Sequence, residues 1–185
     1  MQTKEPDLLL WTDGSGHQDG FGGYAAFVRT SDNLVRHFCM GSASDSSVDR
    51  MEFTALIEGL RMCIEMWQRF PNSYDNPMSD CPTMKKPRIR WYSDRESLIM
   101  SVKKVYSREN CPDLWAAFEV YEKMIHLEPV FMAEAVAEAS EEFTEVDLQS
   151  STGRLMMRDY YRNTPLRVDE TLMKEHKKKK EKPTT

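Results

Sequence analysis

Three acidic residues in this sequence lie at places that the edge of a buried sheet could bring together. The apolar run Leu8–Trp11 leads to Asp13 and then to a glycine, which is typical of a buried strand that ends on a carboxylate. The run Arg88–Ser93 has the same character and is followed by Asp94. Glu52 lies in the first turn of a predicted amphipathic helix. A buried carboxylate is costly without a cationic partner, so the convergence of these three acids would create a site for a divalent metal ion.

The length and the net charge of the chain limit the class of protein to which it can belong. A chain of 185 residues is long enough for one domain with a substantial core. Its 25 lysines and arginines against 30 acids give a net charge of −5, so a polyanionic partner must be attracted by a local basic patch or by bound metal. The four cysteines show no CxxC spacing, which predicts reduced thiols in a cytoplasmic protein. No apolar run approaches the length of a membrane span, so we expect no membrane partner, and we expect a monomer.

The predicted elements around these acids mix strands and helices. The repeat of Leu56, Leu60, Ile64 and Trp67 predicts a helix that begins near Arg50 and turns one face to the core. The other predicted elements are strands over 7–13, 24–28, 34–41 and 88–94, and helices over 96–106 and 112–126. The residues at 70–87 are rich in proline and predict a long surface loop or insertion. This order predicts a mixed sheet flanked by helices.

The end of the chain is harder to assign from its sequence. Pro129–Met132 favours a strand, whereas the alanines that follow favour a helix. Phe143–Leu148 is a second candidate strand, Ser150–Gly153 predicts a turn, and Arg154–Arg162 predicts the last helix. We therefore predict one domain over residues 1–165 and a disordered basic tail over 166–185.

Five short motifs add a more specific indication because they occur together. In chain order they are Thr12–Ser15, Gly22–Ala26, Asp49–Glu52, Tyr92–Asp94 and Asp113–Trp115. With these motifs, and with Asp159 on the last predicted helix, the sequence resembles the type 1 ribonuclease H family of bacteria and retroviruses over nearly all of residues 7–162. The resemblance implies an α/β ribonuclease H-like fold, in which a five-stranded mixed sheet of order 3-2-1-4-5 is flanked by helices.

The resemblance also implies an activity and a cofactor. It implies an endonuclease that hydrolyses the RNA strand of RNA–DNA hybrids with two Mg²⁺ or Mn²⁺ ions, which activate a water and stabilise the leaving oxygen. Asp13 would contact both ions, Glu52 and Asp94 would hold one, and Asp159 would hold the other. A site of carboxylates without cysteine or histidine suits these ions better than zinc. Asp147, at the end of the second candidate strand, is the alternative to Asp159.

Two features of this sequence depart from the family's pattern. The family places two asparagines before Arg-Met-Glu, where they help to read the RNA strand, but here those positions are Val48 and Asp49. Asp49 would repel a phosphate unless it is paired or points away. The family also tends to carry a histidine before its last helix, and this sequence has none between residues 127 and 175.

Two classes of function therefore remain open. The first is the metal-dependent nuclease, whose substrate could also be double-stranded RNA or structured DNA. The second is a catalytically inactive ribonuclease H-like module that binds nucleic acid or has a structural role. Four acids kept together favour the nuclease, because a scaffold gains nothing from unpaired carboxylates that face one another. A proofreading-type exonuclease is disfavoured, because Ser15 stands where it would carry a second acid.

The lysine-rich tail gives a first prediction. Lys177–Lys180 could neutralise phosphates that the acidic body cannot, although a purely solubilising tail is the open alternative. We expect truncation after Val168 to weaken binding to an RNA–DNA hybrid and to flatten its salt dependence, with little change in turnover at saturation. Fluorescence anisotropy over a series of salt concentrations measures both quantities, and an unchanged slope would exclude a role for the tail in binding.

Overall fold

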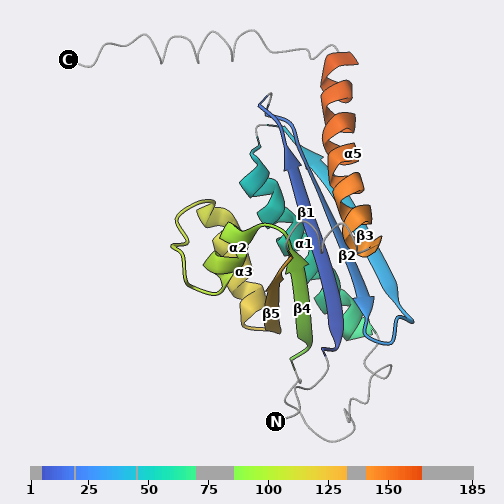
Figure 1. Cartoon of the computed structure of the whole chain (residues 1–185), viewed down its shortest axis with the longest axis vertical. Helices are drawn as coiled ribbons and strands as arrows, with labels where there is room; N and C mark the ends of the chain where they lie inside the picture. Colours follow the sequence, from blue (N-terminus) through green and yellow to red (C-terminus); the bar gives the residue numbers. More distant parts are fainter. Residues whose placement is uncertain (1–5, 19, 45, 70–85, 133–140, 164–185) are drawn as a thin grey trace, which may run out of the picture.

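The computed structural model describes residues 6–18, 20–44, 46–69, 86–132 and 141–163. Five strands form one sheet: β1 (Leu8–Gly16), β2 (Gly22–Thr30), β3 (Arg36–Ala43), β4 (Arg88–Ser93) and β5 (His126–Phe131). Their order across the sheet is β3-β2-β1-β4-β5 (Figure 1). The β1–β2 and β2–β3 pairs are antiparallel, whereas the β1–β4 and β4–β5 pairs are parallel. The predicted mixed sheet and its strand order are confirmed.

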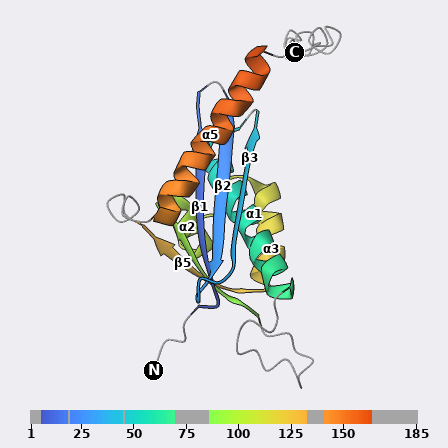
Figure 2. The same ribbon diagram turned by 90° about the vertical axis from the view of Figure 1, so that its right-hand side faces the viewer.

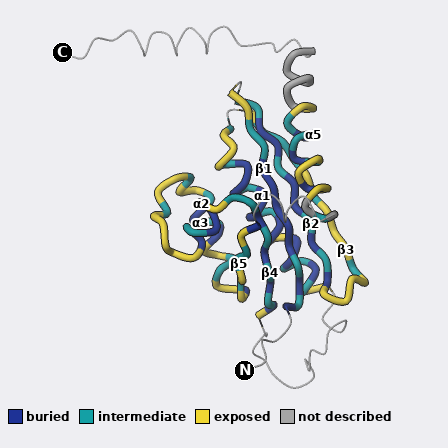
Figure 3. The backbone as a smooth tube through the Cα atoms, viewed as in Figure 1, coloured by how far each residue is buried: buried dark blue, intermediate teal, exposed yellow. Residues whose placement is uncertain are grey.

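The described residues form four helices, α1 (Val48–Arg69), α2 (Glu96–Val102), α3 (Pro112–Glu122) and α5 (Glu141–Asn163), of which α3 packs against α1. Figure 2 shows α1 and α3 on one face of the sheet and α5 on the other. None of the helices within the described ranges is long and apolar enough to cross a membrane. Figure 3 shows that burial is concentrated in the central strands and α1, whereas β3 and the loop between α2 and α3 are exposed.

Alternation along β1 divides the core between the two faces. Leu8 and Leu10 are fully buried against α1, together with Leu56 and Leu60 from the predicted helical repeat. Trp11 instead belongs to a smaller cluster with Val146 on the α5 side. The other two members of the repeat, Ile64 and Trp67, are only partly buried. Strand β1 thus contacts α1 on one face of the sheet and α5 on the other, and its carboxyl end lies between the two helices.

Helix α5 is where the sequence-based assignment is wrong. The residues expected to form a strand over 143–148, a turn over 150–153 and a helix over 154–162 all belong to one continuous helix. The small residues Ser150 and Gly153 are there for packing, since a Cβ on Gly23 of β2 would lie 2.0 Å from the Ser150 carbonyl oxygen. A Cβ on Gly153 would likewise lie 2.8 Å from the carbonyl oxygen of Gly41 in β3. Small residues on both sides let the helix backbone approach the sheet, and they do not mark a turn.

Smaller differences concern the ends of elements. Helix α2 ends at Val102, before the predicted residue 106, and α3 ends at Glu122 because β5 already begins at His126. The parallel pairing of β5 with β4 takes His126, the last residue of the predicted helix. The proline-rich segment lies outside the described residues over 70–85, and so does the lysine-rich tail.

The close approach of α5 to β2 can be tested with one glycine. We expect Gly23→Ala to lower the free energy of unfolding by at least about 2 kcal/mol, because the new methyl group would meet the α5 backbone, which cannot give way locally. The matched control is Gly59→Ala in α1, where the nearest atom is a Leu10 methyl carbon at 2.6 Å. That side chain can shift and alanine favours the helix, so the cost should stay below about 1 kcal/mol. Urea unfolding measures both, and equal costs would contradict the close helix–sheet contact.

Candidate metal centre

Asp13 lies near the end of β1 on the face that α5 covers. Its side chain is buried, with 6% of its surface exposed. The Ser150 hydroxyl of α5 donates a hydrogen bond to Oδ2 of Asp13, and the Ser15 hydroxyl donates to the Ser150 carbonyl oxygen at 2.8 Å. The neighbouring Thr12 faces the other way and accepts a 2.7 Å hydrogen bond from the indole nitrogen of Trp91. Helix α5 therefore fixes the Asp13 carboxylate from one side.

Glu52 reaches the same place from the opposite face of the sheet. It lies in the first turns of α1, and only 4% of its surface is exposed. The approach depends on Gly14, because a Cβ there would lie 2.1 Å from the Glu52 backbone nitrogen. The helix starts at this point because the Ser47 hydroxyl accepts a 3.2 Å hydrogen bond from the Arg50 backbone N–H. The Asp-Gly pair of β1 thus supplies one carboxylate and the space for another.

Asp94 completes the group at the end of β4. Because β4 runs parallel to β1, the carboxyl ends of both strands meet at the same edge of the sheet. The Ser93 hydroxyl accepts a 3.0 Å hydrogen bond from the backbone N–H of Arg95 as the chain turns into α2. One ligand oxygen from each of Asp13, Glu52 and Asp94 lies within 4.8 Å of the other two. The structure thus brings together the three acids that the sequence placed at strand ends and in a first turn.

The electrostatics of this group favour a bound cation. Burial, together with repulsion from Asp94 and Asp147, raises the pKa of Asp13 to about 6, although the bond from Ser150 acts in the opposite direction. Burial also raises the pKa of Glu52 well above its ordinary value, with repulsion from Asp13 and Asp94 adding to the effect. Glu52 Oε2 is buried without a hydrogen-bond partner in the described part of the chain. An unpartnered carboxylate oxygen beside two further carboxylates fits a hard divalent cation such as Mg²⁺.

Among the described residues, Asp147 is the next carboxylate whose charge reaches this group, although it lies outside the 4.8 Å cluster. It is exposed at the start of α5, one turn before Ser150, and its charge contributes to the raised pKa of Asp13. Asp159 lies twelve residues further along the same helix, which is about 18 Å along its axis. The side chain of Asp159 lies outside the described part of the structure. Leu155 and Met156, which precede Asp159 on this helix, are both exposed.

The sequence analysis did not single out Ser150 as part of the site. A signal was present, since Val146, Ser150 and Gly153 recur at helical spacing and place an apolar or small residue on one face. Read as a helix, that face predicts close packing and puts Asp147 next to it. Asp49 and Arg95 form an ion pair beside the metal centre that was not expected either, although Asp49 itself had drawn attention.

Comparison with known proteins extends this description of the fold. No protein-family description matches the sequence, and no curated protein matches it either. The N-terminal ribonuclease H domain of Rv2228c from Mycobacterium tuberculosis, solved as a fusion with maltose-binding protein, superimposes with a TM-score of 0.64 at 12% identity. The match covers 85% of this chain and 99% of that one.

Two further solved structures were determined with nucleic acid. LC11 ribonuclease H1 in complex with an RNA/DNA hybrid gives a TM-score of 0.60 at 14% identity, over 81% of this chain and 98% of that one. The foamy viral protease-reverse transcriptase in complex with dsDNA gives 0.59 at 11% identity, over 81% and 95% of the two chains. The chain therefore has the ribonuclease H fold, as the resemblance in its motifs implied.

The raised pKa of Asp13 predicts how stability depends on pH. An acid whose pKa is higher in the folded than in the unfolded state binds more protons when folded, so stability falls as the pH rises. We expect metal-free protein to lose stability as the pH rises from 3.8 through about 6. Asp13 accounts for up to about 3 kcal/mol of this loss, and Glu52 acts in the same direction.

Asp13→Asn should remove much of this pH dependence and raise the melting temperature of metal-free protein at pH 7. Added Mg²⁺ should then stabilise the wild type but not the variant. Asp32→Asn is the control, because the Thr30 hydroxyl and the Leu34 N–H lower the pKa of that exposed carboxyl and the cluster is left intact. Calorimetry between pH 4 and about pH 8 measures these changes, and equal pH profiles for wild type and Asp13→Asn would contradict the strained cluster.

Proposed function

We propose that this protein is a ribonuclease H-type endonuclease that hydrolyses the RNA strand of RNA–DNA hybrids and requires Mg²⁺ or Mn²⁺. The observation that carries the proposal is the group of three carboxylates within 4.8 Å, in which a buried Glu52 oxygen has no partner among the described residues. Purely structural roles do not explain such an arrangement, because mutual repulsion and burial both oppose it. The ribonuclease H fold supports the proposal, since it places the group at a sheet edge beside an exposed helix start.

Each acid has a role that follows from its position. Asp13 belongs to the group with Glu52 and Asp94 and also feels the charge of Asp147, so it would contact both ions of a pair, while Glu52 and Asp94 would hold one of them. Asp147 would hold the other, in place of the Asp159 that the resemblance suggested. Two bound Mg²⁺ ions supply an activated water and stabilisation of the leaving oxygen in phosphodiester hydrolysis.

The surrounding residues of this chain prepare the carboxylates for that role. The bond from Ser150 holds Asp13 in one orientation, and the Gly14 backbone donates hydrogen bonds that favour the charged forms of both Asp13 and Glu52. Because the pKa of Asp13 is about 6, the group binds cations more readily as the pH rises through that value. Asp147 is exposed and Asp94 is partly exposed, which leaves one side open for a nucleic-acid strand.

The substrate and setting are part of the same proposal. LC11 ribonuclease H1, which shares the fold, was solved with an RNA/DNA hybrid, which supports a hybrid as the substrate. The net charge of −5 means that the body of the protein does not attract polyanions by itself, so bound cations contribute to substrate affinity. We propose a monomeric cytoplasmic enzyme.

A cleavage assay with asparagine substitutions at Asp13, Asp147 and Asp159 tests the mechanism. The substrate is a labelled RNA–DNA hybrid with Mg²⁺ or Mn²⁺, compared with matched double-stranded RNA and DNA and with a chelator. We expect Asp13→Asn to abolish cleavage, and Asp147→Asn to lower it by more than the roughly 10- to 100-fold cost of losing an outer-shell partner. Asp159→Asn, on the same helix, is the matched control and should stay within about twofold of wild type.

The outcomes separate the possible functions. Loss of cleavage in Asp159→Asn with full activity in Asp147→Asn would identify Asp159, and not Asp147, as the fourth metal ligand. Cleavage that persists in Asp13→Asn would remove that residue from the mechanism. Hybrid binding without cleavage by any tested metal would indicate the inactive nucleic-acid-binding module.

A further inference from the structure

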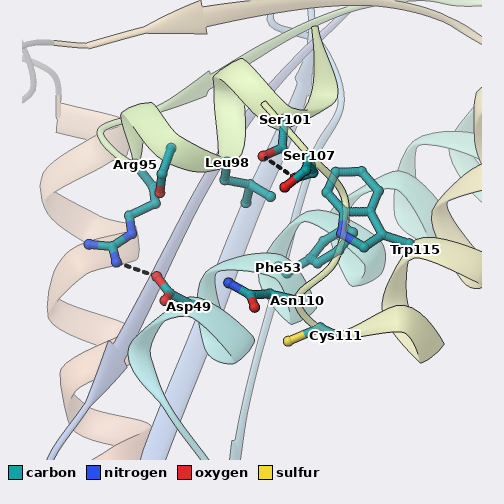
Figure 4. Close-up of a pocket in the computed structure, with 10 residues that line it drawn as sticks. Asp49, Phe53, Arg95, Leu98, Ser101, Ser107, Asn110, Cys111 and Trp115 are labelled. Carbon is teal, nitrogen blue, oxygen red and sulfur yellow. Dashed lines mark hydrogen bonds and ion pairs between the residues drawn. The ribbon is translucent and has the colours of Figure 1, made fainter. Parts of the chain in front are cut away.

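An ion pair beside the carboxylate group has no role in the proposed hydrolysis. Arg95 directly follows Asp94, and its Nη2 donates a hydrogen bond to Oδ1 of Asp49 in the first turn of α1 (Figure 4). The pair joins the start of α2 to the start of α1. It also neutralises Asp49, the residue whose charge would otherwise repel a phosphate at this position.

Arg95 keeps unused donors after this bond is made. A guanidinium group carries five N–H donors in a planar fork, and the bond to Asp49 uses one from Nη2. Its Nε is buried and has no hydrogen-bond partner within the described part of the chain, so a ligand would reach the free donors of Nη1 and Nη2. The side chain is still 40% exposed, so a ligand can reach the group. A guanidinium held at one corner, with donors to spare, can bind a second oxyanion.

Arg95 lies near the carboxylate group and also lines a pocket. Its positive charge lowers the pKa of Glu52, against the effects of burial and repulsion, so the two groups lie within electrostatic reach. On the other side is a cavity of about 310 Å³, whose apolar wall includes Phe53, Leu98 and Trp115. Figure 4 shows the Asp49–Arg95 pair on one side of this cavity and Trp115 on the other. A strand held at the carboxylates would therefore pass close to the guanidinium.

We propose that Arg95 binds a phosphate group of the nucleic-acid strand held at the carboxylate group, and that Asp49 is the positioning residue that orients the guanidinium. This inference rests on the proposed function. The planar fork of arginine matches the oxygens of a phosphate, and the ion pair reduces the entropy lost when the side chain is ordered on binding. Arg95 then provides local positive charge on a protein whose net charge is negative.

Binding measurements with three variants test the inference without relying on activity. The probe is a fluorescent RNA–DNA hybrid, and the assay is anisotropy over a salt series with Ca²⁺, which takes the same oxygen ligands as Mg²⁺. We expect Arg95→Gln to weaken binding about tenfold and to reduce the slope of log Kd against log salt by about 1. Asp49→Asn should keep the slope, because Arg95 keeps its charge and its donors, and should weaken binding by up to about threefold, because the guanidinium is oriented less firmly.

The double variant Arg95→Gln/Asp49→Asn separates a phosphate contact from simple neutralisation of Asp49. It removes both charges of the pair, so the local net charge equals that of the wild type. If Arg95 binds phosphate, the double variant should stay as weak as Arg95→Gln and keep its reduced slope. Recovery of wild-type affinity in the double variant would overturn the inference, because Arg95 would then serve only to neutralise its partner.

A second ion pair provides a matched control. Arg50 on α1 pairs with Asp113 on α3, and the exposed fractions of these side chains, 39% and 55%, nearly equal the 40% and 53% of Arg95 and Asp49. Arg50→Gln should leave the salt slope unchanged. Absence of hybrid binding by the wild type would overturn the proposed function itself. Wild-type binding with the same slope in Arg95→Gln would overturn the phosphate contact alone.

Discussion

The main physical constraint on this structure is the repulsion among the buried carboxylates at the ends of β1 and β4. Asp13 and Glu52 are almost fully removed from water, and each raises the cost of ionising the other. Arg95 lies within electrostatic reach of Glu52 but forms its ion pair with Asp49, so its charge offsets the repulsion on Glu52 only in part. The surrounding core must offset this cost, and the apolar cluster between the sheet and α1, with Leu8, Leu10 and Trp91, is large enough to do so.

Close backbone packing is what allows the acids to meet. Gly14 admits the first turn of α1 from one face, and Gly23 admits α5 from the other. Both glycines belong to the antiparallel β1–β2 pair, in which Gly14 lies opposite Tyr24 and Gly23 opposite Ser15. A methyl group at either position would push a helix away and take with it Glu52 or Ser150. The geometry of the carboxylate group thus depends on missing side chains as much as on the acids.

The residues beside the carboxylate group include Asp49, where this chain departs from the ribonuclease H family pattern that its motifs resemble. An aspartate replaces an expected asparagine at position 49, and it is paired with Arg95 and does not face the site as a free charge. The charges of Asp49 and Arg95 compensate each other, which is why an acid is tolerated beside a surface proposed to bind phosphates. Substrate recognition at this edge would then rest on a guanidinium, a donor, where an asparagine offers both a donor and an acceptor.

The amino-acid sequence by itself indicated strands β1 to β4 and the three acids, whereas the strand order was an implication of the family resemblance. Apolar runs and glycine turns are local signals, and the parallel pairing of β1 with β4 brings the strand-end acids to one edge. Helix α5 was decided only by tertiary structure. Ser150 and Gly153 are equally compatible with a turn, and only their contacts with β2 and β3 show that they are small for packing. That contact is the reason for proposing Asp147 in place of Asp159, because Ser150 fixes which turn of the helix lies beside Asp13. The partner of Asp49 could likewise not be predicted from the sequence, since Arg95 lies 46 residues away and only the fold brings the starts of α1 and α2 together.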